Sequence, residues 1–175
     1  PCARRIGTMK RMLTAGLLLM AAGTGGCQTT PVTVSSLPPR PVDRVDNVAL
    51  RISPPMPLNW DDMPGLDGLQ AQVNLFQLDQ PLSVTVEGSL EFLLYEGRGT
   101  EQALAGGEPF RTWTFEGPQL RRCLGRSMFG WGYVMRLGWG STPPKSPSVT
   151  LVARYRPVSG RDLSSDPLHL AIVPK

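Results

Sequence analysis

Hydrophobic and polar residues alternate along most of the chain from residue 47 onward. Runs of four to eight residues with a period of two are typical of β-strands that bury one face. Motifs typical of turns, such as Asp67-Gly68, Gly106-Gly107 and Pro143-Pro144, separate the runs. The pattern predicts an all-β fold, an antiparallel β-sandwich of seven or eight strands. The runs span 48–52, 69–75, 82–86, 90–94, 110–115, 131–139, 149–155 and 168–172.

One segment, GPQLRRCLGR, has a helical pattern instead. Pro118 suits the first turn of a helix, and Gly125 suits its end. Leu120, Cys123 and Leu124 would share one apolar face. We therefore expect one short helix that crosses from one sheet to the other.

The stretch MKRMLTAGLLLMAAGTGGCQTT, residues 9–30, has the order of a secretory signal peptide. Lys10 and Arg11 precede an apolar run that is too short to span a bilayer as a helix. Met9 is a natural start for such a signal, so residues 1–8, including Cys2, are left out of the fold prediction.

Small residues precede Cys27 in the segment Thr24-Gly25-Gly26-Cys27, which resembles a bacterial lipobox. The resemblance implies that Cys27 receives diacylglycerol and becomes the new N-terminus. Thr24 departs from the aliphatic residue usual at that position, and a simple secretory cut after Ala21-Ala22-Gly23 is the alternative. No aspartate follows Cys27, which by the same resemblance implies the outer membrane.

The segment after the cysteine is rich in proline, threonine and serine. We expect residues 27–46 to form an extended, polyproline-II-like tether. The alternative is that this segment packs along the domain as an edge. The predicted organisation is thus a removed leader over 1–26, a lipidated tether over 27–46 and a β-sandwich domain over 47–175.

Removal of residues 1–26 changes the charge of the protein. The full chain has a net charge of +4, and the leader carries four basic residues and no acidic one. The remainder therefore has 14 basic and 14 acidic residues. This balance does not favour nucleic acid as a partner. Acylation of Cys27 would leave Cys123 as the only thiol, so no intrachain disulfide is expected.

Residues 148–173 resemble the final hairpin of a fibronectin-III or immunoglobulin-like domain, without the cysteine pair of antibody domains. The whole chain is similar to planctomycete-type bacterial lipoproteins with one Ig-like or transthyretin-like domain. That resemblance rests on GLDGLQAQV, GSLEFLLYE and GWGYVMRLGWG. It implies a location in the cell envelope, and the function of these lipoproteins is unassigned.

The residues that could support catalysis or bind a metal are few. His169 has opposite parity to its apolar neighbours and is expected to face solvent. Cys123 is expected to be a small buried hydrophobe, with a thiolate activated by nearby arginines as the alternative. Asp61, Asp62 and Asp67 lack the spacing of a calcium loop. No catalytic residue, metal or cofactor is predicted.

Two groups of residues are candidates for ligand contact. Trp131 and Trp139 share a strand face and are expected to be core residues, with a carbohydrate platform as the alternative. Arg121, Arg122 and Arg126 are expected on a solvated helix face, or in contact with phosphate or uronate groups of envelope glycans.

The function hypothesis is a non-enzymatic structural or interaction module, exported and anchored by lipid in the cell envelope. Its partners would be the membrane, through the acylated N-terminus, and envelope proteins or glycans. The alternative is a glycan- or small-ligand-binding accessory protein of an envelope enzyme or transporter. An enzyme would need His169 and an acidic residue to converge in a cleft, and the spacing does not require this.

Overall fold

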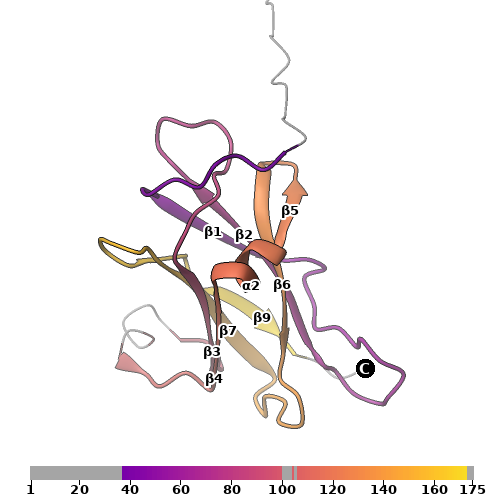
Figure 1. Cartoon of the computed structure of the whole chain (residues 1–175). Coiled ribbons are helices and arrows are strands. Elements are labelled where there is room, and N and C mark those ends of the chain that lie inside the picture. Colours follow the sequence, from indigo (N-terminus) through magenta and orange to yellow (C-terminus); the bar gives the residue numbers. More distant parts are fainter. Residues whose placement is uncertain (1–36, 100–103, 105, 173–175) are drawn as a thin grey trace, which may run out of the picture. The chain divides into compact units, whose positions relative to one another are not determined.

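The predicted all-β sandwich is confirmed. The computed structural model describes residues 37–99, 104 and 106–172, which belong to one unit that spans 34–175. Two antiparallel sheets form the domain (Figure 1). The first contains, in spatial order, β1 (Asn47–Ile52), β2 (Gly68–Phe76), β6 (Gly130–Gly138) and β5 (Leu124–Ser127). The second contains β4 (Arg111–Glu116), β3 (Ser89–Glu96), β7 (Ser148–Arg156) and β8 (Leu163–Ser164), and β9 (Leu168–Ala171) also pairs with β7. Within the described residues, no helix is both long and apolar enough to cross a bilayer.

The core lies between the inward faces of the two sheets. The alternating positions of the sequence supply it, because every second residue of a strand points to the same face. Four strands contribute most of the side chains that are at most 1% exposed. These include Leu69, Val73, Leu75, Leu90, Phe92, Leu94, Met135, Leu137, Leu151 and Tyr155.

The run 82–86 does not form a ladder strand, although Val84 and Val86 are buried as expected. The segment crosses the end of β2 and makes single bridges to three different parts of the chain. Val84 N–H donates to the Leu75 carbonyl oxygen at 2.8 Å. The polar positions Ser83 and Thr85 are also buried, so the alternation does not correspond to one buried and one exposed face in this segment. Two short strands, β5 and β8, were not predicted.

The predicted crossover helix is present but shorter than expected. Helix α2 (Gly117–Arg122) connects β4 of one sheet to β5 of the other. Leu124 and Gly125 do not extend it, because they pair with Tyr133 and Gly132 of β6. Pairing with the edge of β6 satisfies the backbone hydrogen-bonding groups of these two residues. It therefore takes the place of the last helical turn.

Residues 37–46, the N-terminal segment, contact the domain. Val42 N–H donates to the Thr85 carbonyl oxygen at 2.8 Å, and Val45 is buried. This described part of the expected tether thus follows the alternative, packing along the domain. The rest of the tether, together with the predicted signal peptide and Cys27, lies outside the described residues.

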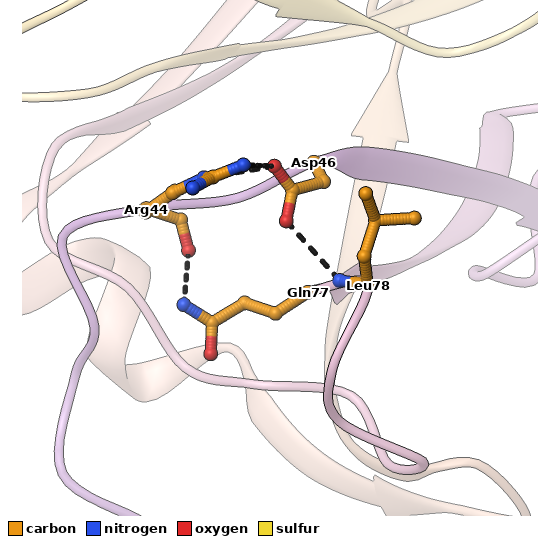
Figure 2. A network of polar contacts seen from close by, with 4 residues as sticks. All are labelled: Arg44, Asp46, Gln77 and Leu78. Atoms are coloured by element: carbon orange, nitrogen blue, oxygen red, sulfur yellow. Dashed lines mark hydrogen bonds and ion pairs between the residues drawn. The ribbon is translucent and has the colours of Figure 1, made fainter.

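A polar network holds the N-terminal segment to the end of β2 (Figure 2). Asp46 accepts a hydrogen bond from Leu78 N–H at 3.1 Å and pairs with Arg44 at 2.9 Å. Gln77 donates its amide N–H to the Arg44 carbonyl oxygen at 2.8 Å. The hydrogen bond from Leu78 and the ion pair lower the pKa of Asp46. The charged form of Asp46 is therefore the one that the network favours.

The Asp67-Gly68 motif predicted a turn at this position. In the structure, Gly68 is instead the first residue of β2. It pairs with Gly138, and the Trp60 ring lies over both glycines. A Cβ at Gly68 would lie 2.3 Å from the Leu137 carbonyl oxygen and 2.7 Å from the Trp60 ring. Only glycine, which has no Cβ, allows the backbones of β2 and β6 and the Trp60 indole to approach one another this closely.

Gly68→Ala should therefore destabilise the fold by about 2 kcal/mol or more, because backbone and indole cannot both move away from the new methyl group. Urea denaturation followed by circular dichroism measures the change. Gly125→Ala is the matched control, since its Cβ would meet only Val134 Cγ2 at 3.6 Å. Equal unfolding midpoints for the two variants would contradict this account.

Two buried tyrosines join the sheets to the loops at the same end as the N-terminal segment. The Tyr133 hydroxyl oxygen accepts a hydrogen bond from Val86 N–H at 2.9 Å, and the Tyr155 hydroxyl donates to the Glu87 carbonyl oxygen at 2.8 Å. Burial raises the pKa of Tyr155 to about 12. Tyr133 and the carboxylates of Asp43 and Glu87 act in the same direction.

The free energy of unfolding should fall as the pH rises from 10 to 12. The folded-state pKa of Tyr155 lies above its ordinary value of 10.0. Its stabilising contribution is therefore complete below pH 10 and is lost as pH approaches the folded value. Urea titrations at a series of pH values would compare the wild type with Tyr155→Phe, which should show a shallower decline. Parallel curves would exclude Tyr155 as the titrating group.

Candidate functional site

A pocket of about 550 Å³ opens at one end of the sandwich, between the loop before β2 and the loop that joins β6 to β7. We call it the end pocket. Its volume is in the range of small-molecule sites. Its lining residues are Pro64, Gly65, Leu66, Asp67, Trp139, Gly140, Pro143, Pro144, Lys145, Ser146, Pro147 and Ile172.

Proline makes the walls of the end pocket stiff. Pro64 comes from the first loop, and Pro143, Pro144 and Pro147 come from the second. Each pyrrolidine ring fixes φ near −65° and removes a backbone donor. The walls therefore have a defined shape and an apolar character before any ligand is present.

Trp139 connects the two loops behind the end pocket. Its backbone N–H donates to the Asp67 carbonyl oxygen at 2.9 Å, and its indole N–H donates to the Leu66 carbonyl oxygen. Ile172 N–H donates to the Pro147 carbonyl oxygen at 2.8 Å. These bonds tie both loops and the end of the last strand to the core.

Glu96, at the end of β3, holds the loop from the other sheet. One of its carboxylate oxygens accepts the backbone N–H of Lys145 at 2.5 Å and that of Ser146 at 3.4 Å. Hydrogen bonds to a carboxylate are stronger than those between neutral groups. The Lys145–Ser146 peptide is thus fixed by a charge at the rim of the end pocket.

Lys145 is the only lysine among the described residues. It is exposed, and its ammonium group makes no ion pair with any residue in the described part of the chain. The lining of the end pocket thus combines prolines and other apolar residues with two charged residues, Lys145 and Asp67. Such a site can hold an apolar body and orient one acidic group.

The three candidate arginines do not form one group. Arg121 and Arg122 are exposed on α2, at the opposite end from the end pocket. Arg122 lines an open cleft of about 870 Å³ with Arg156, and the latter already pairs with Glu91 at 3.1 Å. Arg126 lies on β5, so only two of the predicted trio share the helix.

The two candidate tryptophans also differ. Trp139 has no exposed surface and is the core residue that the alternation predicted. It cannot present a ring face to a carbohydrate. Trp131 is partly buried, and the Arg126 guanidinium carbon lies 5.7 Å from the centre of its ring. Arg126 and Trp131 are cross-strand neighbours, which explains the cation–π pair.

Cys123 is half-buried at the end of α2, against the core. Its thiol donates a hydrogen bond to the Gln119 carbonyl oxygen at 3.4 Å. Burial raises the pKa of Cys123, so the alternative of a thiolate activated by nearby arginines is wrong. The thiol is a packing group at the end of the helix.

His169 is exposed on β9, as its parity predicted. The Thr150 hydroxyl donates to the Gly97 carbonyl oxygen at 2.8 Å, so His169 Nδ1 is the donor in its 2.9 Å contact with that hydroxyl. This contact attaches β9 to the strand beside it.

The acidic residues of the NWDDMPGLDG segment organise its backbone. One Asp61 carboxylate oxygen accepts the Met63 N–H at 2.8 Å, and one of Asp67 accepts the Trp60 N–H at 2.5 Å. Across the described residues, no cluster of three or more histidine, cysteine or acidic side chains is arranged to hold a metal ion. These aspartates therefore shape the loop that carries Trp60 and Pro64.

The end pocket was not predicted from the sequence. Its visible signal is the proline cluster STPPKSP together with the PGLDG segment, and both were interpreted only as turns. Their convergence depends on the pairing of β2 with β6, which alternation alone does not specify. Comparison of the chain with protein-family models, curated proteins and solved structures finds no match.

Glu96→Ala should expose the Lys145–Ser146 bond to trypsin. Loss of the carboxylate that binds both N–H groups frees the loop, and we expect cleavage after Lys145 to accelerate about fivefold or more. Mass spectrometry of the fragment 146–175 follows the rate. Cleavage after Arg161, in the turn before β8, is the internal reference and should not change. An unchanged ratio of the two rates would contradict the role of Glu96.

Proposed function

We propose that the protein is a non-enzymatic, lipid-anchored interaction module of the cell envelope. The observation that supports this most is the placement of two features along the same strands. The N-terminal segment packs where β2 ends, because Asp46 N–H donates to the Phe76 carbonyl oxygen at 2.9 Å. The end pocket includes Leu66 and Asp67, which directly precede the start of β2.

Strands β2 and β6 separate the two features (Figure 1). Each strand has nine residues, which corresponds to about 30 Å at 3.4 Å per residue. A domain attached through its N-terminal segment would therefore direct the end pocket away from the attachment point. This polarity suits a module that presents a binding site from a surface.

The anchor in this proposal is Cys27, in the lipobox-like segment TGGC after a basic and apolar leader. Stable attachment needs more than one acyl chain, since a single chain binds membranes only marginally. Without an aspartate after the cysteine, we infer the outer membrane as the destination.

A second candidate function is an accessory protein that binds a small ligand for an envelope enzyme or transporter. The end pocket favours this candidate over a purely structural role, because stiff apolar walls and one free ammonium group are features of binding sites. A glycan platform at Trp139 has no such support, since that ring is buried.

Cys27→Ser should move the protein from the membrane fraction to the soluble fraction of the envelope. The lipid is attached to this sulfur in the proposal, so the variant has no acyl chain to hold it to the membrane. Fractionation in a bacterial host, followed by immunoblotting, measures the distribution. Cys123→Ser is the matched control and should stay with the membranes. Sedimentation of Cys27→Ser with membranes would overturn the anchor.

A further inference from the structure

We propose that the end pocket binds a compact aromatic or alicyclic carboxylate. Its ring would pack among the prolines, and its acid group would pair with Lys145. The inference deepens the binding role proposed above, but it does not depend on the lipid anchor.

The shape of the end pocket favours a ring. Pyrrolidine rings from both loops line a volume of about 550 Å³. Aromatic rings pack readily against proline, as in the recognition of proline-rich segments by aromatic grooves. Because proline fixes the backbone of both loops, little conformational entropy is lost when a ring enters.

The hydrogen-bonding capacity of the walls argues against a sugar. The four prolines have no N–H, and the backbone N–H groups of Asp67, Lys145, Ser146 and Ile172 already have acceptors within the chain. Few N–H donors in the walls are thus left for the oxygens of a polyol, and an oxygen without a donor is a cost to binding. A ligand with an apolar body avoids this cost.

Lys145 is the one basic side chain among the residues that line the end pocket. Two carboxylates lie near the end pocket, and both accept backbone N–H groups: Asp67 from Trp60, and Glu96 from the Lys145 loop. The Lys145 ammonium has no counter-ion among the described residues. A ligand carboxylate would supply one, and such an ion pair at an exposed lysine contributes up to about 1 kcal/mol, which is about fivefold in affinity.

Three probes with the same ring separate the contributions of ring and charge. 2-Naphthoate, 2-naphthalenemethanol and 2-naphthylmethylammonium would be titrated into the full chain carrying Cys27→Ser, which has no acyl group to compete for the site. Amide chemical shifts in NMR spectra would report both affinity and location. We expect saturable binding in the order carboxylate, alcohol, ammonium, with shifts at Gly65 and Gly140.

Variants of Lys145 test the charge directly. Lys145→Glu should weaken 2-naphthoate binding about fivefold or more, and Lys145→Arg should retain it. Arg161→Glu makes the same change in net charge at an exposed site that the end pocket does not include, and it should leave binding unchanged.

Several results would overturn the inference: no saturable binding, shifts centred elsewhere, equal affinity for the ammonium probe, or equal loss in both charge-reversal variants. None of these would affect the anchor, which the fractionation of Cys27→Ser tests separately. Conversely, binding of 2-naphthoate by a protein whose membrane association does not need Cys27 would retain the end pocket and reject the anchor.

Discussion

The inward-facing row of β6 is the interaction on which the rest of the domain depends. Four side chains follow one another along one face, and each has at most 1% of its surface exposed: Tyr133, Met135 and Leu137 of β6, and Trp139 directly after the strand. No disulfide links the described strands, so burial of rows like this one supplies the main driving force for folding. The side chain at each end of the row also forms a hydrogen bond to the backbone of a loop. The Tyr133 hydroxyl holds Val86 at one end, and the Trp139 indole holds Leu66 at the other.

The sequence predicted those parts of the fold that a regular period encodes. In β2, for example, the buried residues Leu69, Ala71 and Val73 alternate with half-buried glutamines, and this alternation results directly from the burial of one face. Strand β5 has only four residues and includes Gly125 and Arg126, so too few apolar positions repeat for a period to be visible. The same limit explains the helix end, because the choice between helix and strand at Leu124 depends on the neighbouring β6.

The candidate site was less predictable for a related physical reason. Alternation correctly identified Trp139 as a core residue, and parity correctly placed His169 at the surface. The end pocket, however, exists because two loops 70 or more residues apart meet behind Trp139, at the ends of paired strands. Individual turn motifs indicate where the chain bends, but they contain no information about which other turn lies beside them. The raised pKa of Cys123 likewise depends on burial against the core, and the nearby arginines in the sequence pointed in the opposite direction.

The connection between β6 and the end pocket has a consequence for binding. Trp139 belongs to the core and at the same time bonds to the loop residues Leu66 and Asp67. The walls of the end pocket therefore cannot keep their shape when the inward row of β6 is disrupted. A ligand that binds only this shape stabilises the folded state by mass action. The gain in the free energy of unfolding grows with the logarithm of the ratio of the ligand concentration to its dissociation constant. Occupancy of the end pocket and stability of the sandwich are thus coupled through one indole, at the end of the domain opposite to the N-terminal segment.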